Sequence, residues 1–245
     1  MLCAVIYAGL ASEADMRLYY DLHIHSALSP CADDDMTPNN IVNMAKLKGL
    51  DLITVSDHNC AKNVRAAAKV AEDEGVLLLP GIEMTTAEEV HLLVFFADAL
   101  QAEDFGDLLY DALPDIKNKP DFFGNQLVMD ENDEVKGTLE KLLISALPYD
   151  IDESCALARE HGGYVVPAHI NKGANSMLAN LGFFPPQIHF KTIEVVRGLA
   201  IENDVSRFEQ IHSSDAHNLW QISEKSEQLE TPDRELKTIL KKLCE

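Results

Sequence analysis

The sequence predicts an α/β fold, a distorted seven-stranded (β/α)7 barrel with a metal site at the carboxyl ends of its strands. Three observations support this prediction. Short β-branched or apolar runs recur along the 245 residues, most of them are separated by helix-like segments, and several end directly at His, Asp or Glu. Because barrel enzymes assemble their chemistry where parallel strands end, these polar residues are expected to lie at one rim.

The expected strands alternate with helices, as in parallel strands joined by right-handed crossovers. The strands are Leu18–Leu22, Asp51–Val55, Val76–Ile82, Val90–Phe96, Tyr164–Pro167, Thr192–Val196 and Gln210–Ser213. A first helix begins at Pro38, behind the potential N-cap Thr37. A second, Ala-rich helix ends at Gly75, and a third spans Asp152–His161.

The chain is interpreted as a single domain over residues 16–245, with an insertion at about 98–150. The insertion interrupts the alternation of strands and helices, contains a helix-like segment at 139–147, and is expected to form a lid over the site. Residues 1–15 are interpreted as an N-terminal extension, with a cleaved signal segment as the alternative. No apolar run approaches the roughly 20 residues that span a bilayer, so no membrane partner is expected.

The chain carries a formal net charge of −21. A protein whose main task is to follow a phosphate backbone usually presents a Lys/Arg surface. The charge therefore favours a small or exposed-end substrate and disfavours an extended nucleic acid as partner. The cysteines are scattered without a CxxC pair, which is typical of reduced residues in a cytoplasmic protein.

Side chains of metal-binding type lie at or near the ends of the expected strands. They are His23, His25, Asp57, His58, Glu83, His91, His169, Asp215 and His217. Alternate residues of a strand share one face, so His23 and His25 point the same way, as do Asp215 and His217. Imidazole with carboxylate suits Zn²⁺, Mn²⁺ or Fe²⁺ better than Mg²⁺ or Ca²⁺. The set exceeds the ligands of one ion, which predicts two or three divalent transition-metal ions.

The order of these motifs resembles that of the PHP (polymerase and histidinol phosphatase) family of metal-dependent phosphoesterases. The matching motifs are HxH at 23–25, SDH at 56–58, a strand ending at Glu83, then His91, PAH at 167–169 and DAH at 215–217. The resemblance implies one ion held by His23, His25, Glu83 and Asp215. It implies a second that shares Glu83 and adds His91 and His169, and a third on His58, His217 and an acidic residue.

The chain departs from the family pattern after HxH, where many relatives carry Ser-Asp-Gly and this sequence has SPCADDDMTP. Counting back from Thr37 and Pro38 places Asp33 at the family position, with Asp34 and Asp35 directly behind it. Asp33 is therefore the expected carboxylate of the third site, and its two neighbours remain alternatives.

Two ions sharing a carboxylate can hold a bridging hydroxide that attacks phosphorus in line, which predicts phosphomonoester hydrolysis. His58 and His217 are expected to act catalytically on the leaving oxygen, and Asp57 to orient a ligand. The expected substrate-binding residues are Lys172, Arg197, Ser26 and Asn59.

The leading hypothesis is a phosphatase for a small phosphorylated molecule, of nucleotide or amino-alcohol phosphate type. One alternative is a nuclease or proofreading activity at a nucleic-acid 3′ end. Another is a non-catalytic regulatory module stabilised by metal. The sequence leaves the choice among zinc, manganese and iron open, as well as the oligomeric state.

Overall fold

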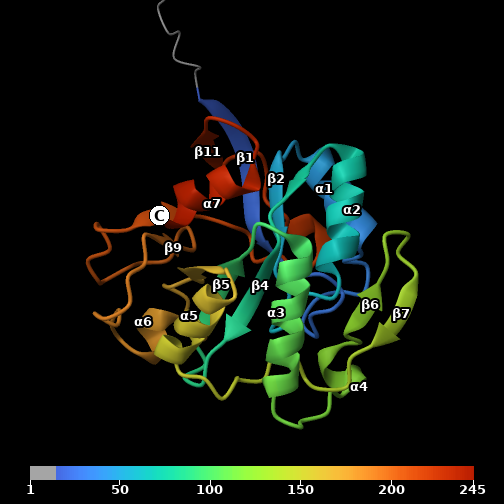
Figure 1. Cartoon of the computed structure of the whole chain (residues 1–245), viewed down its shortest axis with the longest axis horizontal. Coiled ribbons are helices and arrows are strands. Elements are labelled where there is room, and N and C mark those ends of the chain that lie inside the picture. The colour runs from blue at the N-terminus through green and yellow to red at the C-terminus, as the bar shows by residue number, and fades with distance from the viewer. Residues whose placement is uncertain (1–14) are drawn as a thin grey trace, which may run out of the picture.

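The computed structural model describes residues 15–245, so all but the last residue of the predicted N-terminal extension lies outside the described residues. The strands are β1 (Met16–Ile24), β2 (Leu52–Val55), β3 (Leu77–Leu78), β4 (Gly81–Thr85), β5 (His91–Phe95), β6 (Leu127–Met129), β7 (Val135–Thr138), β8 (Tyr164–Pro167), β9 (Thr192–Glu194), β10 (Glu209–Ile211) and β11 (Gln228–Thr231). The helices are α1 (Pro38–Leu47), α2 (Val64–Glu74), α3 (Ala99–Ala112), α4 (Pro120–Phe123), α5 (Ile151–Glu160), α6 (Met177–Asn180) and α7 (Leu236–Cys244), with a 3₁₀ turn at Leu219–Gln221. The fold is thus mixed α/β, as predicted (Figure 1).

The strands form separate sheets in the orders β11-β1-β2-β3, β4-β5-β8, β9-β10 and β6-β7. Two isolated parallel bridges, Ile24 to Ala216 and His58 to Glu83, connect the first sheet to the segment after β10 and to β4. No sheet closes into a barrel within residues 15–245, so the seven-stranded barrel stays a prediction.

The prediction of uniformly parallel strands is wrong at β5, which runs antiparallel to both β4 and β8. The chain between β4 and β5 is too short for a crossover helix, and Thr86 N–H donates to Val90 O at 2.9 Å to close the turn. The reversal places the start of β5 at the same rim as the ends of β4 and β8. His91 therefore joins residues that follow strands, although it begins its own.

The predicted helices begin and end close to where their capping residues indicate. Thr37 Oγ1 accepts a hydrogen bond from Asn40 N–H at the start of α1, and Gly75 ends α2 with a left-handed φ of 76°. Asp150 and Glu153 form a capping box that opens α5. The predicted strand Val76–Ile82 instead splits into β3 and β4.

The insertion at 98–150 contains α3, α4 and the β6–β7 hairpin, which lies with α4 at the edge of the molecule (Figure 1). The helix predicted at 139–147 is absent. Its backbone is used by long-range hydrogen bonds instead, from Leu142 N–H to Ile116 O at 2.8 Å and from Leu147 N–H to Thr85 O at 3.0 Å. Leu143 and Leu147 are buried in the main core, so the segment is integrated with the fold.

The main core extends from the end of β1 through α1, α2, β4 and β5 to β9. A smaller apolar cluster lies between β1, β8 and α7. Within the described part of the chain, no helix combines the length and apolar character needed to cross a membrane.

Candidate metal centre

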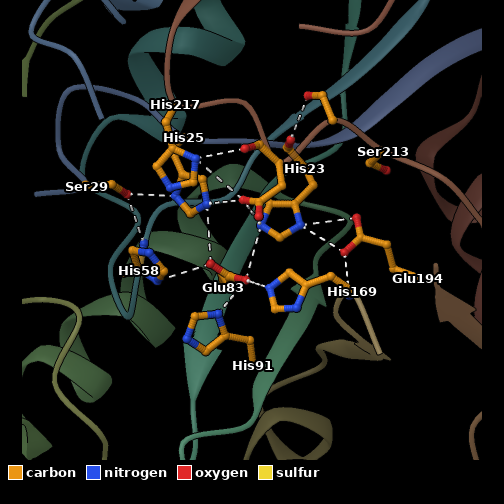
Figure 2. Close-up of polar contacts among 12 residues, drawn as sticks. His23, His25, Ser29, His58, Glu83, His91, His169, Glu194, Ser213 and His217 are labelled. Carbon is orange, nitrogen blue, oxygen red and sulfur yellow. Dashed lines mark hydrogen bonds and ion pairs between the residues drawn. The ribbon is translucent and has the colours of Figure 1, made fainter. Parts of the chain in front are cut away.

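The Glu83 carboxylate lies at the centre of a group of imidazoles (Figure 2). Oε1 is 2.8 Å from His91 Nδ1, 2.9 Å from His169 Nε2 and 3.3 Å from His23 Nε2. Oε2 is 3.1 Å from His58 Nδ1 and 3.3 Å from His25 Nε2. Glu83 is 1% exposed, so one buried carboxylate faces five imidazoles.

His23 is oriented by Glu194, at the end of β9. His23 Nδ1 is 3.1 Å from each Glu194 oxygen, and Oε2 of Glu194 also accepts a hydrogen bond of 2.7 Å from His169 N–H. Because a carboxylate only accepts, Nδ1 of His23 carries the proton and Nε2 is left unprotonated when the ring is neutral. That nitrogen faces Glu83 and Asp215, each at 3.3 Å.

His25 is oriented through Ser29. Ser29 Oγ donates its hydrogen to Asp57 Oδ1 at 2.7 Å and lies 2.9 Å from His25 Nδ1. A hydroxyl has one hydrogen, so Nδ1 of His25 must donate to Ser29 and Nε2 faces Glu83 and Asp215. Asp57 therefore positions an imidazole through Ser29 and does not itself reach the centre.

The segment after β10 supplies Asp215 and His217 next to the end of β1. His25 N–H donates to Ala216 O at 2.9 Å, and the Asp215 carboxylate lies 3.1 Å from His25 Nε2. Asp215 also pairs with Lys172. Left-handed backbone at Asp215, φ 53°, and at His169, φ 27°, is uncommon outside glycine and accompanies this inward arrangement of side chains.

The charged side chains of the centre shift one another's pKa values. Burial alone would raise the pKa of Glu83, but the imidazoles of His91, His23 and His58 outweigh it and hold the pKa well below its usual value. Burial would lower the pKa of His25, yet Asp215 and Glu83 raise it to about 9. Metal binding must therefore displace protons from this group.

His58 and His217 differ from His25 in charge. Burial, only partly offset by Glu83, holds the pKa of His58 well below its usual value. Burial, together with the neighbouring His25, lowers the pKa of His217 to about 4. Both rings are neutral near pH 7, which is the form that binds metal ions.

Among residues 15–245, the donor atoms fall into three clusters in which each atom lies within 4.8 Å of the others. The clusters are His23, His25, Glu83 and Asp215; His58, Glu83 and His91; and His25, Cys31, His58 and His217. His23 Nε2 and His58 Nδ1 are buried with no hydrogen-bond partner of good geometry, an arrangement that is costly unless a further group binds there. The residues present thus fit divalent metal ions.

The structure places some predicted residues away from the clusters. Asp33 is exposed, and its N–H donates to His217 O at 2.9 Å; neither it nor Asp34 or Asp35 belongs to a cluster among the described residues. Arg197 forms a surface ion pair with Glu227.

Ser26 and Asn59 are both buried and serve the internal framework. Ser26 donates to Asp57 through its N–H and its hydroxyl. Asn59 donates to Leu143 O and Ser145 O. Neither side chain lines the cavity described next.

A cavity of about 290 Å³ opens beside the clusters. His58, Glu83, His91, His169, Asp215, His217, Cys31, Lys172 and Glu89 line it, with Ile144 and Ala146 from the insertion. Of the four residues predicted to bind substrate, the cavity includes Lys172.

Sequence reasoning missed Glu194 and Asp21. Asp21 accepts hydrogen bonds from Ser214 N–H, Ser214 Oγ and Ser223 N–H, and so fixes the loop that carries Asp215. Each is an acid inside an otherwise apolar strand run, at 0% and 2% exposure for Asp21 and Glu194. A buried carboxylate needs hydrogen-bond donors, so an acid within an apolar strand run indicates a residue that holds other polar groups in place.

Comparison with known proteins gives matches in sequence and in structure. The family model of the PHP domain matches residues 21–150. The 5′-3′ exoribonuclease of Haemophilus influenzae is 31% identical over 71 residues, 29% of this chain and 25% of that protein. The 3′,5′-nucleoside bisphosphate phosphatase of Chromobacterium violaceum is 31% identical over 67 residues, 27% of this chain and 22% of that protein.

Among solved structures, a lesion-specific endonuclease from Pyrococcus furiosus shares the fold with a TM-score of 0.64 at 21% sequence identity. The match covers 93% of this chain and 56% of the endonuclease. The chain also spans about a quarter of the length of the curated relatives given above.

Proposed function

Because this chain belongs to the PHP domain family, we propose that it is a metal-dependent phosphoesterase that hydrolyses a small phosphomonoester, of nucleotide or amino-alcohol phosphate type. The observation that carries the proposal is the buried carboxylate of Glu83 facing five imidazoles. Such a carboxylate can be shared between two ions, as in catalytic two-metal sites. A structural site that holds a single ion does not need a shared ligand.

Two or three ions of zinc, manganese or iron are proposed. His23, His25, Glu83 and Asp215 would hold one; Glu83, His91 and His169 would hold the second; His58 and His217 would hold a third. When bound, such ions generate a water-derived nucleophile near neutral pH and neutralise phosphoryl oxygens.

The protein residues around the ions have proposed roles of their own. His58 and His217 line the cavity and would act at the leaving oxygen through the ion that they hold. Lys172 lines the same cavity and would bind a phosphoryl oxygen. Asp57, which has no direct access to the cavity, is assigned a positioning role through Ser29 and His25.

The size and charge of the cavity support a small substrate. At about 290 Å³ it lies at the lower end of the range for small-molecule sites. Ile144 and Ala146 form part of its wall, which supports the proposal that the 98–150 segment covers substrate within one catalytic domain. The net charge of −21 would repel a long polyanion. No disulfide occurs in the described part of the chain, which fits a cytoplasmic location.

A second candidate is hydrolysis of a nucleic acid. It is favoured by the names of two matches, an exoribonuclease and a lesion-specific endonuclease. An exposed strand end would need only its terminal phosphate to reach the ions through the cavity.

A phosphate-release assay, combined with chromatography of the cleaved dinucleotides and oligonucleotides, separates these candidates. Protein loaded with Mn²⁺ or Zn²⁺ is given nucleoside monophosphates, amino-alcohol phosphates, dinucleotides and single-stranded oligonucleotides. The proposal expects the highest kcat/KM with a monophosphate, and loss of activity in His91→Ala but not in the matched control His161→Ala at the exposed end of α5. Faster cleavage of oligonucleotides supports the second candidate, and metal binding without any hydrolysis supports a regulatory module.

A further inference from the structure

Cys31 lies in the third cluster, where the sequence led us to expect a carboxylate. Its sulfur and one nitrogen from each of His25, His58 and His217 all lie within 4.8 Å of one another. The imidazoles are packed together, with ring centroids 4.3 Å apart for His25 and His217 and 4.6 Å apart for His25 and His58. His58 is 5% exposed, and its Nδ1 lies 3.1 Å from Glu83 Oε2 without the geometry of a hydrogen bond.

The loop that carries Cys31 is held on both sides. Before it, Ser29 contacts His25 and Asp57 and its carbonyl accepts from Ala32 N–H at 3.0 Å. After it, the N–H of Asp33 donates to the carbonyl of His217. In this loop Asp33 is exposed, and Cys31 lies at the cavity wall.

His25 is better assigned to the first cluster than to this one. Its Nδ1 is occupied by Ser29, and its Nε2 faces Glu83 and Asp215. The remaining three donors, Cys31, His58 and His217, all line the cavity. This arrangement corresponds to a zinc site with three protein ligands and one position open to a substrate or water.

The donor chemistry separates this cluster from the other two. Those contain Glu83, whereas this one has no carboxylate. Sulfur and imidazole favour zinc over manganese or magnesium, which prefer oxygen. Tetrahedral zinc holds such ligand atoms roughly 3.3 to 3.6 Å apart, so the cluster needs only a modest contraction to bind it.

We propose that Cys31 is a metal ligand and that Cys31, His58 and His217 form a zinc-selective site with an open position facing the cavity. Binding forms a sulfur–zinc bond and releases the thiol proton to solvent. The role of the open position at the leaving oxygen rests on the proposed function. The metal site itself can be tested without a substrate.

Cobalt(II) is a spectroscopic substitute for zinc that reports sulfur ligation. Titration of the metal-free protein with Co²⁺ should produce a thiolate-to-cobalt charge-transfer band in the near ultraviolet, with a final intensity that corresponds to about one thiolate-bound Co²⁺ per chain. Cys31→Ser should abolish the band and weaken zinc binding at this site by about 100-fold or more, while ions at the other clusters remain. Cys244→Ser, a half-buried cysteine on α7, should leave the band unchanged.

A second measurement avoids mutation. Zinc should slow the alkylation of Cys31 in the unaltered protein by about 10-fold or more, as read at that residue by mass spectrometry. Unchanged alkylation, or a cobalt band that survives in Cys31→Ser, would overturn the inference. A cobalt band without any phosphoester hydrolysis would support the Cys31 site and reject the proposed function. Hydrolysis without a cobalt band and without protection of Cys31 would support the proposed function and reject the Cys31 site.

Discussion

Replacing Glu83 by glutamine should remove ions from two of the three clusters at once. Glutamine has nearly the same size, but it keeps one accepting oxygen and replaces the other by an NH₂ group that cannot bind a metal ion. Both carboxylate oxygens are in use, since Oε1 faces His91, His169 and His23 and Oε2 faces His58 and His25. Because glutamine is also neutral, the oxygen that it keeps no longer supplies the negative charge that both ions would share.

The magnitude follows from the cluster membership. Glu83 belongs to two clusters and is absent from the one that contains Cys31. A fully loaded protein should therefore lose about two ions per chain and keep about one. Because metal ions contribute several kcal/mol of transition-state stabilisation, about 4 kcal/mol lost corresponds to a roughly 10³-fold fall in kcat.

Elemental analysis after dialysis in metal-buffered solution measures the ions, and phosphate release measures kcat. Glu89→Gln is the matched control, because Glu89 lines the same cavity but belongs to none of the clusters. It should retain all the ions and most of the activity. Loss of a single ion from Glu83→Gln, or an unchanged metal content, would refute the bridging role.

Three further predictions follow from individual contacts. Glu194→Gln should weaken metal binding by about 10- to 100-fold without changing the number of sites, because Glu194 orients His23 and binds no ion itself. Isothermal titration measures the affinity, and an unchanged affinity would contradict the positioning role of Glu194. Lys172→Ala should chiefly raise KM, since an ammonium that holds phosphate equally in ground and transition states affects binding alone; steady-state kinetics in which only kcat falls would argue against it. At low salt, kcat/KM should be higher for a nucleoside monophosphate than for an oligonucleotide, and this difference should narrow as salt screens the net charge of −21. A higher kcat/KM for the oligonucleotide would support the nuclease alternative.

The local sequence pattern was sufficient to predict the positions of several helices and strands and the polar residues at their ends. The β-branched runs and capping residues located β1, β2, β8, α1 and α5 to within a few residues. The HxH spacing placed His23 and His25 at the end of β1, where both face Glu83. These features depend on alternation along a strand and on the identity of adjacent residues, which the chain expresses locally.

The antiparallel direction of β5 follows from the short connection after β4, whereas the failed helix at 139–147 depended on distant partners. The apolar spacing of 139–147 is typical of a helix, but hydrogen bonds to Ile116 and Thr85 offered its backbone a competing arrangement. Neither partner is recognisable from the segment itself.

By itself, the sequence determined which residue types end the strands, and therefore that a group of imidazoles and carboxylates would meet at one rim. The tertiary structure decided which of them meet. Counting along the loop pointed to Asp33, but that residue is exposed and belongs to none of the clusters, whereas Cys31 lies beside the imidazoles. Glu194 acquires a role because β9 brings it beside His23. The reason is that a strand's periodicity is set by its own backbone, whereas the direction of a loop side chain is set by hydrogen bonds to residues far away in the sequence.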